Sequence, residues 1–85
     1  MKPSRKVSWF VETRGVTLWS RDGSVCLSIP YPHAGLWALI ANGNYNPACA
    51  AELLSVLMSI GRQEAMREVE KTLAAWRQEG FLSED

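Results

Sequence analysis

In the first third of the chain, apolar residues recur at every second position, and Val, Trp, Phe, Thr, Leu and Ile predominate. A period of two is typical of a strand that packs one face against a core. Turn signals at 13–15 and 21–24 divide this segment. We therefore predict three short strands, over 7–13, 15–20 and 24–29, paired in simple antiparallel order with the first and third at the edges.

The same alternation assigns a face to each side chain of this sheet. The residues expected to face the core are Val16, Leu18, Val25, Leu27 and Ile29. Trp19 is expected to face outward, together with either Phe10 or the pair Trp9 and Val11. Cross-strand packing of these aromatic residues is favoured over a binding surface.

After the sheet the apolar period changes to that of helices. The segment Pro30-Tyr31-Pro32 is expected to end the sheet, and Pro32 suits the first turn of a helix. Three helices are predicted, over 32–41, 47–59 and 62–79. Their apolar stripes are Leu36, Leu39 and Ile40 with Trp37 at the border, then Ala50, Leu53, Leu54, Leu57 and Met58, then Met66, Val69, Leu73 and Trp76.

Turn-forming residues separate the helices and explain the stretch "WALIANGNYNPACAAELL". Asn42-Gly43 suits left-handed termination of the first helix, and Asn46 with Pro47 suits the start of the second. Gly61 and Gly80 are expected to close the second and third helices, after which Phe81 and Leu82 fold back onto the core. The interval between the first two helices is therefore a corner and not a linker.

The order of elements predicts an α+β fold: a three-stranded antiparallel N-terminal sheet followed by three helices, in a winged helix-turn-helix-like arrangement. With 85 residues, 47% of them hydrophobic, one domain over 1–85 is expected. It comprises a flexible N-terminus over 1–6, the sheet over 7–29 and a helical bundle over 32–82. A core of this size supplies only about 3–5 kcal/mol, so a partner would add appreciably to stability.

Composition predicts a protein of the cytoplasm without a membrane span, because no apolar segment has signal-peptide or transmembrane length. Cys26 and Cys49 are expected to be reduced, mostly buried thiols, since their spacing fits neither a metal site nor a redox pair. His33 stands alone, and no phosphate-binding, zinc-hydrolase or acyl-transfer motif occurs. We expect no catalysis by this chain, no metal and no cofactor.

Charge weighs against a nucleic-acid reader. The net charge is zero, divided into +3 over residues 1–30 and −3 over the remainder. The helix over 62–79 would read DNA, but it carries four cations and four carboxylates, and DNA binding depends on an excess of phosphate contacts. In winged-helix DNA binders the hairpin also follows the reading helix, whereas here the hairpins come first. A winged-helix transcriptional regulator is therefore the less favoured hypothesis, and we keep it as an alternative.

The third strand is the more informative feature. From Ser24 to Ile29 it carries no charge and no proline, the devices that usually protect a sheet edge. Such an edge is suited to accept an extended peptide as an added strand. The alternatives are a loop or the last helix covering the edge, or pairing of the edge in a homodimer.

Four segments in order, "GVTLWSRDGSVCLSI", "GLWALIANG", "AELLSVL" and "VEKTLAAWRQEGFL", cover nearly the whole chain. Their pattern resembles the PQQ-synthesis protein D family, the recognition elements for ribosomally made, post-translationally modified peptides. The matching positions are Leu36, Leu39, Ile40, Gly43, Glu52, Leu53, Leu73, Trp76, Gly80, Phe81 and Leu82. The chain departs from the family pattern at Asn42, where Asp is usual, and at "NYNPACA", where a Thr-rich cap is usual; both suit helix capping.

The resemblance implies a non-catalytic chaperone of natural-product biosynthesis. It would bind the leader segment of a precursor peptide and deliver it to a modifying enzyme, often a radical SAM enzyme, with no role for nucleic acid or membrane. A second alternative is a small structural subunit that docks on a larger enzyme through Phe10 and Trp19.

The expected site lies between the third strand and the last helix. The strand residues are Ser24, Val25, Cys26, Leu27, Ser28 and Ile29. The helix wall is expected to be Arg67, Lys71, Ala74 and Gln78, of which Arg67 and Lys71 would meet acidic leader residues. The opposite flank, Ala65, Glu68, Thr72 and Ala75, is the alternative wall. These helix residues would otherwise be ordinary exposed positions.

Overall fold

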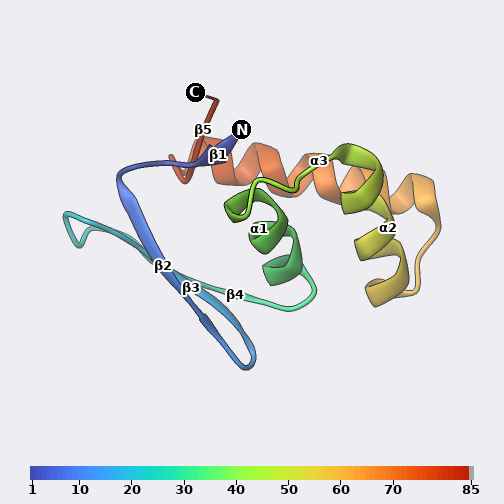
Figure 1. The fold of residues 1–85 in the computed structure, drawn as a ribbon, viewed down its shortest axis with the longest axis horizontal. Helices are drawn as coiled ribbons and strands as arrows, with labels where there is room; N and C mark the ends of the chain where they lie inside the picture. Colours follow the sequence, from blue (N-terminus) through green and yellow to red (C-terminus); the bar gives the residue numbers. More distant parts are fainter. Residues whose placement is uncertain (85) are drawn as a thin grey trace.

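The computed structural model of the chain describes residues 1–84 and has an α+β fold, with a three-stranded antiparallel sheet followed by three helices (Figure 1). The elements in order are β1 (Lys2–Pro3), β2 (Val7–Glu12), β3 (Gly15–Ser20), β4 (Cys26–Pro30), α1 (His33–Ala41), α2 (Pro47–Met58), α3 (Arg62–Gln78) and β5 (Leu82–Ser83). The predicted order of three strands and three helices is confirmed.

The larger sheet has the strand order β2-β3-β4, so β2 and β4 are its edges as predicted. Strand β4 begins and ends later than the predicted 24–29. Pro30 pairs with Gly15 as the last residue of β4, so the sheet ends within Pro30-Tyr31-Pro32 as predicted, and the Tyr31 N–H donates to the Arg14 carbonyl at 3.3 Å. Pro30 is tolerated because an edge strand needs only half of its N–H groups for the ladder.

A second, two-stranded sheet joins the two ends of the chain. Lys2 pairs with Ser83 and Pro3 with Leu82, while the Ser4 N–H donates to the Phe81 carbonyl at 2.8 Å. This pairing was not predicted, and it places β1 inside the segment 1–6 that the sequence analysis expected to be flexible. Figure 1 shows both ends beside the C-terminal part of α3.

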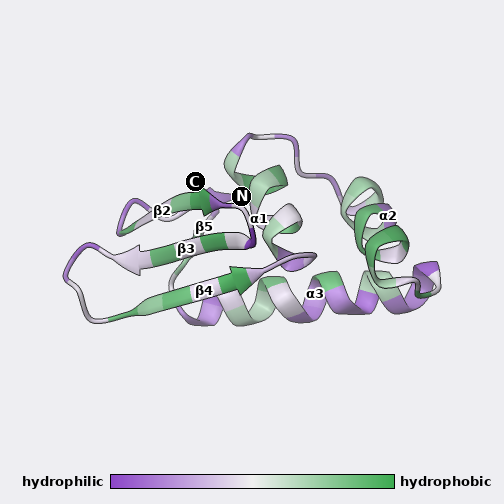
Figure 2. Cartoon of the chain, turned by 90° about the horizontal axis from the view of Figure 1, so that it is seen from below, coloured by the Kyte–Doolittle hydropathy of each residue, from purple (hydrophilic) through white to green (hydrophobic). Residues whose placement is uncertain are grey.

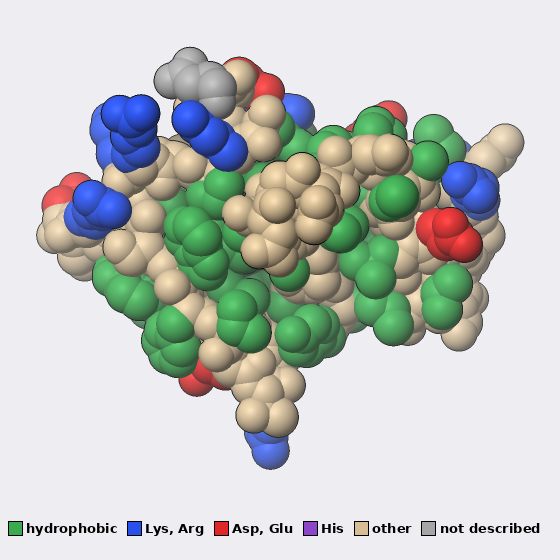
Figure 3. All heavy atoms as spheres, viewed as in Figure 1, with side chains coloured by type: hydrophobic (Ala, Val, Ile, Leu, Met, Phe, Trp, Pro, Cys, Tyr) green, Lys and Arg blue, Asp and Glu red, His purple; other side chains and the backbone are tan. Residues whose placement is uncertain are grey.

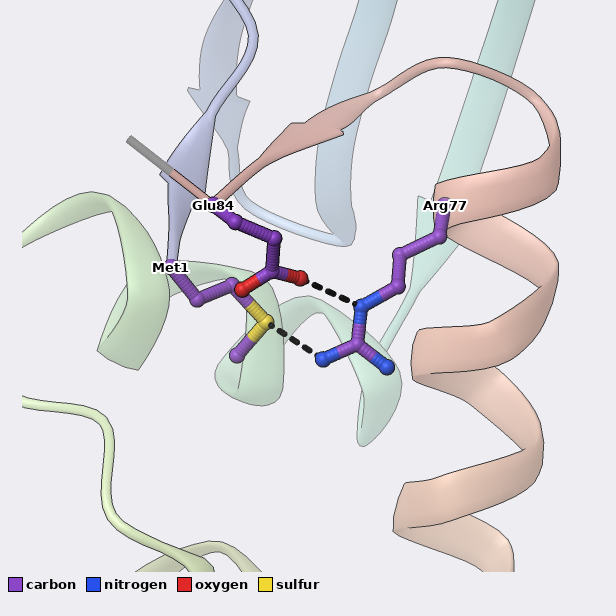
Figure 4. Close-up of polar contacts among 3 residues, drawn as sticks. All are labelled: Met1, Arg77 and Glu84. Atoms are coloured by element: carbon purple, nitrogen blue, oxygen red, sulfur yellow. Dashed lines mark hydrogen bonds and ion pairs between the residues drawn. The ribbon is translucent and has the colours of Figure 1, made fainter.

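Arg77 reinforces this junction from α3. Its Nε donates to Glu84 Oε1 at 2.7 Å, and its guanidinium also reaches the Met1 sulfur at 3.5 Å (Figure 4). Because both groups of the ion pair are about half exposed or more, the contact orients the two ends more than it stabilises the fold.

Local capping explains where the helices begin and end. The Asn46 side chain accepts the Cys49 N–H at 3.0 Å and Pro47 occupies the first turn of α2, as predicted. Gly43 and Gly80 adopt left-handed φ values of 74° and 81° after α1 and α3, also as predicted. Gly61 does not close α2; Ser59 does so with φ 55°, and its N–H donates to the Ser55 carbonyl.

Trp37 of α1 is the centre of the core and not the border residue that its position on the helix predicted. It is fully buried, and its ring packs edge-on against Trp9 of β2 at 5.7 Å and Trp76 of α3 at 5.4 Å. Its indole N–H has no acceptor among the described residues. Such a buried donor costs about 1–3 kcal/mol, so the aromatic contacts must more than offset it.

Several predicted core residues lie at the surface instead. Leu27 is 37% exposed, Leu57 53% and Met66 45%, and Ala65 takes the buried place expected for Met66. Leu27 is exposed because it lines an open groove between β4 and α3, so its side chain is covered only in part. Figure 3 shows hydrophobic side chains over the sheet and over α2 on the face that carries α1.

In the described part of the chain, no helix is long and apolar enough to cross a membrane.

Gly15 fixes the distance between β3 and β4. A Cβ added at this position would collide with the Ile29 carbonyl oxygen, which is backbone and cannot rotate away. We expect Gly15→Ala to lower the free energy of unfolding by about 1–3 kcal/mol, as overpacking does. Urea unfolding followed by Trp fluorescence measures it. The control Gly61→Ala, where an added Cβ meets nothing within 4 Å, should cost less than about 1 kcal/mol; equal losses would contradict this explanation.

Candidate peptide-binding site

Strand β4 has a neighbour on one side only. It pairs with β3, and among residues 1–84 no strand pairs with its other edge, because β5 pairs with β1. Cys26, Ser28 and Pro30 on this strand are all exposed. The chain's own tail therefore leaves the edge open.

The register determines which backbone groups this edge presents. The Val25 carbonyl accepts the Ser20 N–H at 2.9 Å, and the Tyr31 N–H donates to Arg14, so residues 25 and 31 face β3. Backbone groups alternate along an antiparallel strand. It follows that the N–H and C=O groups of Cys26 and Ser28 point away from β3 into the open edge.

The turn before β4 sets where the open edge begins. The Asp22 carboxylate accepts the Ser24 hydroxyl and the Ser20 hydroxyl, both at 2.7 Å, and the Ser24 N–H at 2.9 Å. The hydrogen bonds from Ser24, and then that from Ser20, lower the pKa of Asp22 to about 2. Ser24 was predicted as a pairing residue, but its N–H is already bound, so the edge starts after it.

A groove of about 320 Å³ lies between β4 and α3. Figure 2 shows these two elements running side by side. The lining residues are Val25, Cys26 and Leu27 from the strand side, Ala75, Trp76 and Glu79 from the helix side, and Phe81 after it. Apart from Glu79 the lining is apolar, and the backbone groups of Cys26 open at its rim.

The predicted helix wall needs a correction. Arg67, Lys71, Ala74 and Gln78 are all exposed and do not line the groove. At about 100° per residue they lie on the side of α3 opposite to the buried Ala65, Val69, Leu73 and Trp76. Ala75 and Glu79 line it instead, and Ala75 belongs to the flank that the sequence analysis named as the alternative.

The partly buried Glu68 and Thr72 lie on this same flank, about two turns and one turn before Ala75 respectively. The Glu68 carboxylate lies 3.5 Å from His33 Nε2, at the start of α1. His33 thus occupies the helix start, as expected. The pair joins α1 to α3 beyond the C-terminal end of β4.

At the other end the groove continues around the start of β4. Val25, Glu79 and Phe81 also line a neighbouring depression of about 440 Å³ that reaches Lys6 and Arg21. The only carboxylate shared by the two cavities is that of Glu79, which has no hydrogen-bond or ion-pair partner among the described residues.

The structure also tests the remaining sequence predictions. Cys26 and Cys49 are free but exposed, so the expected burial of both thiols is wrong. Among the described residues, no group of three or more metal-binding side chains occurs. Phe10 and Trp19 stack edge-on at 5.8 Å on the outer face of the sheet, while Trp9 faces Trp37, which decides the choice left open for β2.

Comparison of the chain with family models, curated protein sequences and solved structures gave no match.

Asp22 generates a pH-dependent prediction. Its pKa in the fold, about 2, lies below the ordinary 3.8, so its stabilising effect is present above about pH 4 and is lost as the pH falls toward about 2. We expect the difference in urea midpoint between the wild type and Asp22→Asn to shrink over that interval. Glu52→Gln, an exposed carboxylate on α2, is the control; a difference for Asp22→Asn that stays constant with pH would contradict the role given to this carboxylate.

Proposed function

We propose that this chain is a non-catalytic peptide-binding protein. It captures the leader segment of a ribosomally made precursor peptide as an added strand on β4 and presents it to a modifying enzyme. The open β4 edge beside an apolar groove is the observation that carries this proposal. The winged helix-turn-helix-like arrangement, the cytoplasmic location and the radical SAM identity of the enzyme rest on the order of elements, the composition and the family resemblance respectively.

The backbone supplies the affinity. Two outward N–H groups and two outward C=O groups, those of Cys26 and Ser28, support about four main-chain hydrogen bonds to an incoming strand. Each contributes about 0.5–1.5 kcal/mol. Because these backbone groups make no contact with the side chains of the peptide, the edge accepts many peptide sequences. Selectivity among peptides must therefore come from the adjoining groove.

The groove supplies that selectivity. Alternate side chains of an added strand would point toward α3, where Leu27 and Trp76 form apolar walls and Ala75 leaves space. Burial of one Leu-sized side chain there is worth about 1.5–3 kcal/mol. Together with the hydrogen bonds, this is enough for a specific but reversible complex after the cost of ordering the peptide.

The charge on α3 favours a peptide over DNA. The four cations of α3 are matched by its three carboxylates and that of Glu79, which caps its C-terminus, and Glu68 and Glu79 lie on the flank nearest β4. A phosphate backbone would meet this carboxylate-bearing flank unfavourably. A neutral extended peptide would not.

The edge can be blocked without disturbing the sheet. Cys26→Pro and Ser28→Pro each remove an N–H that points away from β3, so we expect each to weaken peptide binding about tenfold, with a change of only a few degrees in melting temperature. A peptide selected from a random displayed library on the wild-type protein serves as the ligand, measured by isothermal titration. The matched controls Cys26→Val and Ser28→Val keep the N–H; unchanged affinity in the proline variants would refute strand addition.

Amide hydrogen exchange tests the same register by a second route. In the free protein we expect the Leu27 and Ile29 amides to be protected by β3 and the Cys26 and Ser28 amides to exchange fast. The bound peptide should protect Cys26 and Ser28 selectively. Protection of these two amides already in the free protein, independent of protein concentration, would mean that the edge is covered.

A further inference from the structure

The charge in the groove is opposite in sign to the one that the sequence analysis expected. Arg67 and Lys71, which were expected to meet acidic residues of the peptide, lie on the solvent side of α3. The charged side chain that lines the groove is Glu79, and its carboxylate has no partner among residues 1–84.

Glu79 occupies a defined place relative to β4. Both Glu79 and Phe81 line the cavity shared with Val25, whereas Leu27 and Trp76 line only the apolar part of the groove. The groove is therefore apolar at Leu27 and carries one charged side chain, that of Glu79, at its Val25 end, where the neighbouring depression with Lys6, Arg21 and Asp22 begins.

The alternation of side chains along a strand determines which residues of a bound peptide face Leu27 and which face Glu79. Peptide residues that bond to Cys26 and Ser28 place their side chains on the outer face of the sheet, with the side chains of those two residues. Residues opposite Leu27 and Val25 point toward α3. These two peptide residues are separated by one residue, so one side chain meets the apolar wall and the second meets Glu79.

We infer that the peptide captured at this edge carries an apolar residue and a lysine or arginine two positions apart. Since antiparallel pairing is the more stable per residue, the order along the peptide is apolar, any residue, basic. The inference rests on the proposed function, because it needs a peptide strand on β4. It names the class of ligand: an extended segment that is cationic, not acidic, next to its apolar anchor.

The neighbouring depression is consistent with a basic residue of the peptide at Glu79. Beyond Glu79 it carries Lys6 and Arg21, which would repel a second cation. The Asp22 carboxylate also lines this depression, but it already accepts the hydrogen bonds of Ser24 within its own turn. A single basic residue followed by neutral or acidic ones is therefore the expected pattern.

The experiment is selection from a displayed library of random peptides about 12 residues long, enough to span a strand of about 5–6 residues with flanks. Three forms of the protein are used: wild type, Glu79→Lys, and the control Glu70→Lys. Glu70 is a carboxylate of the same helix that lies near Tyr45, outside the groove. All three must show the same melting profile, and individual peptides are then measured by titration at low and high salt.

We expect wild type and Glu70→Lys to enrich the apolar-any-basic pattern, and Glu79→Lys to enrich Asp or Glu at the basic position. Replacing the basic residue of a selected peptide by Gln should lower affinity for wild type about two- to fivefold, less at high salt. This inference is overturned if the enriched peptides are apolar and strand-like but show no charge preference, or if their charge preference is the same with Glu79→Lys as with wild type. Strand addition would still hold in either case. Absence of any enriched peptide from all three folded proteins overturns strand addition itself, and with it this inference.

Discussion

The contact of Trp37 with Trp9 and Trp76 is the constraint on which the rest of the structure depends. One indole ring joins the sheet, α1 and α3, and it does so at the buried centre of a domain that has few other large side chains to spare. Helix α3 is thereby held against the sheet through α1. This indirect attachment leaves a groove along β4 in place of close helix-on-strand packing.

The second determinant is the pairing of β4 with β3. Gly15 permits the close approach to Ile29, and the Asp22 turn delivers the chain to Val25 in a single register. A shift of one residue would exchange the inward and outward N–H groups. Short local features of the sequence thus decide which amides remain open at the edge.

The sequence pattern predicted the elements well because their signals are local. The Asn46 cap, Pro47 and the glycines at 43 and 80 act within one turn of the chain, and the structure has them where they were expected. Alternation likewise assigned Leu27 to the α3 side of β4. It could not indicate that Leu27 is exposed at an open groove, because burial depends on how closely α3 approaches β4.

The site was predicted less completely for the same reason. The amphipathic pattern of α3 identifies its buried side. Which flank of the helix lies beside β4 depends on how the helix crosses the sheet, and Arg67 and Lys71 were therefore assigned to the groove although they lie on the opposite side of α3.

The β1 and β5 strands are two residues each and have no periodicity to detect. Their pairing brings the two ends of the folded unit together beside α3 (Figure 1). A unit closed in this way can be inserted into an exposed loop of a larger polypeptide through two adjacent joints, so the groove along β4 would be kept both in a separate subunit and in an inserted module.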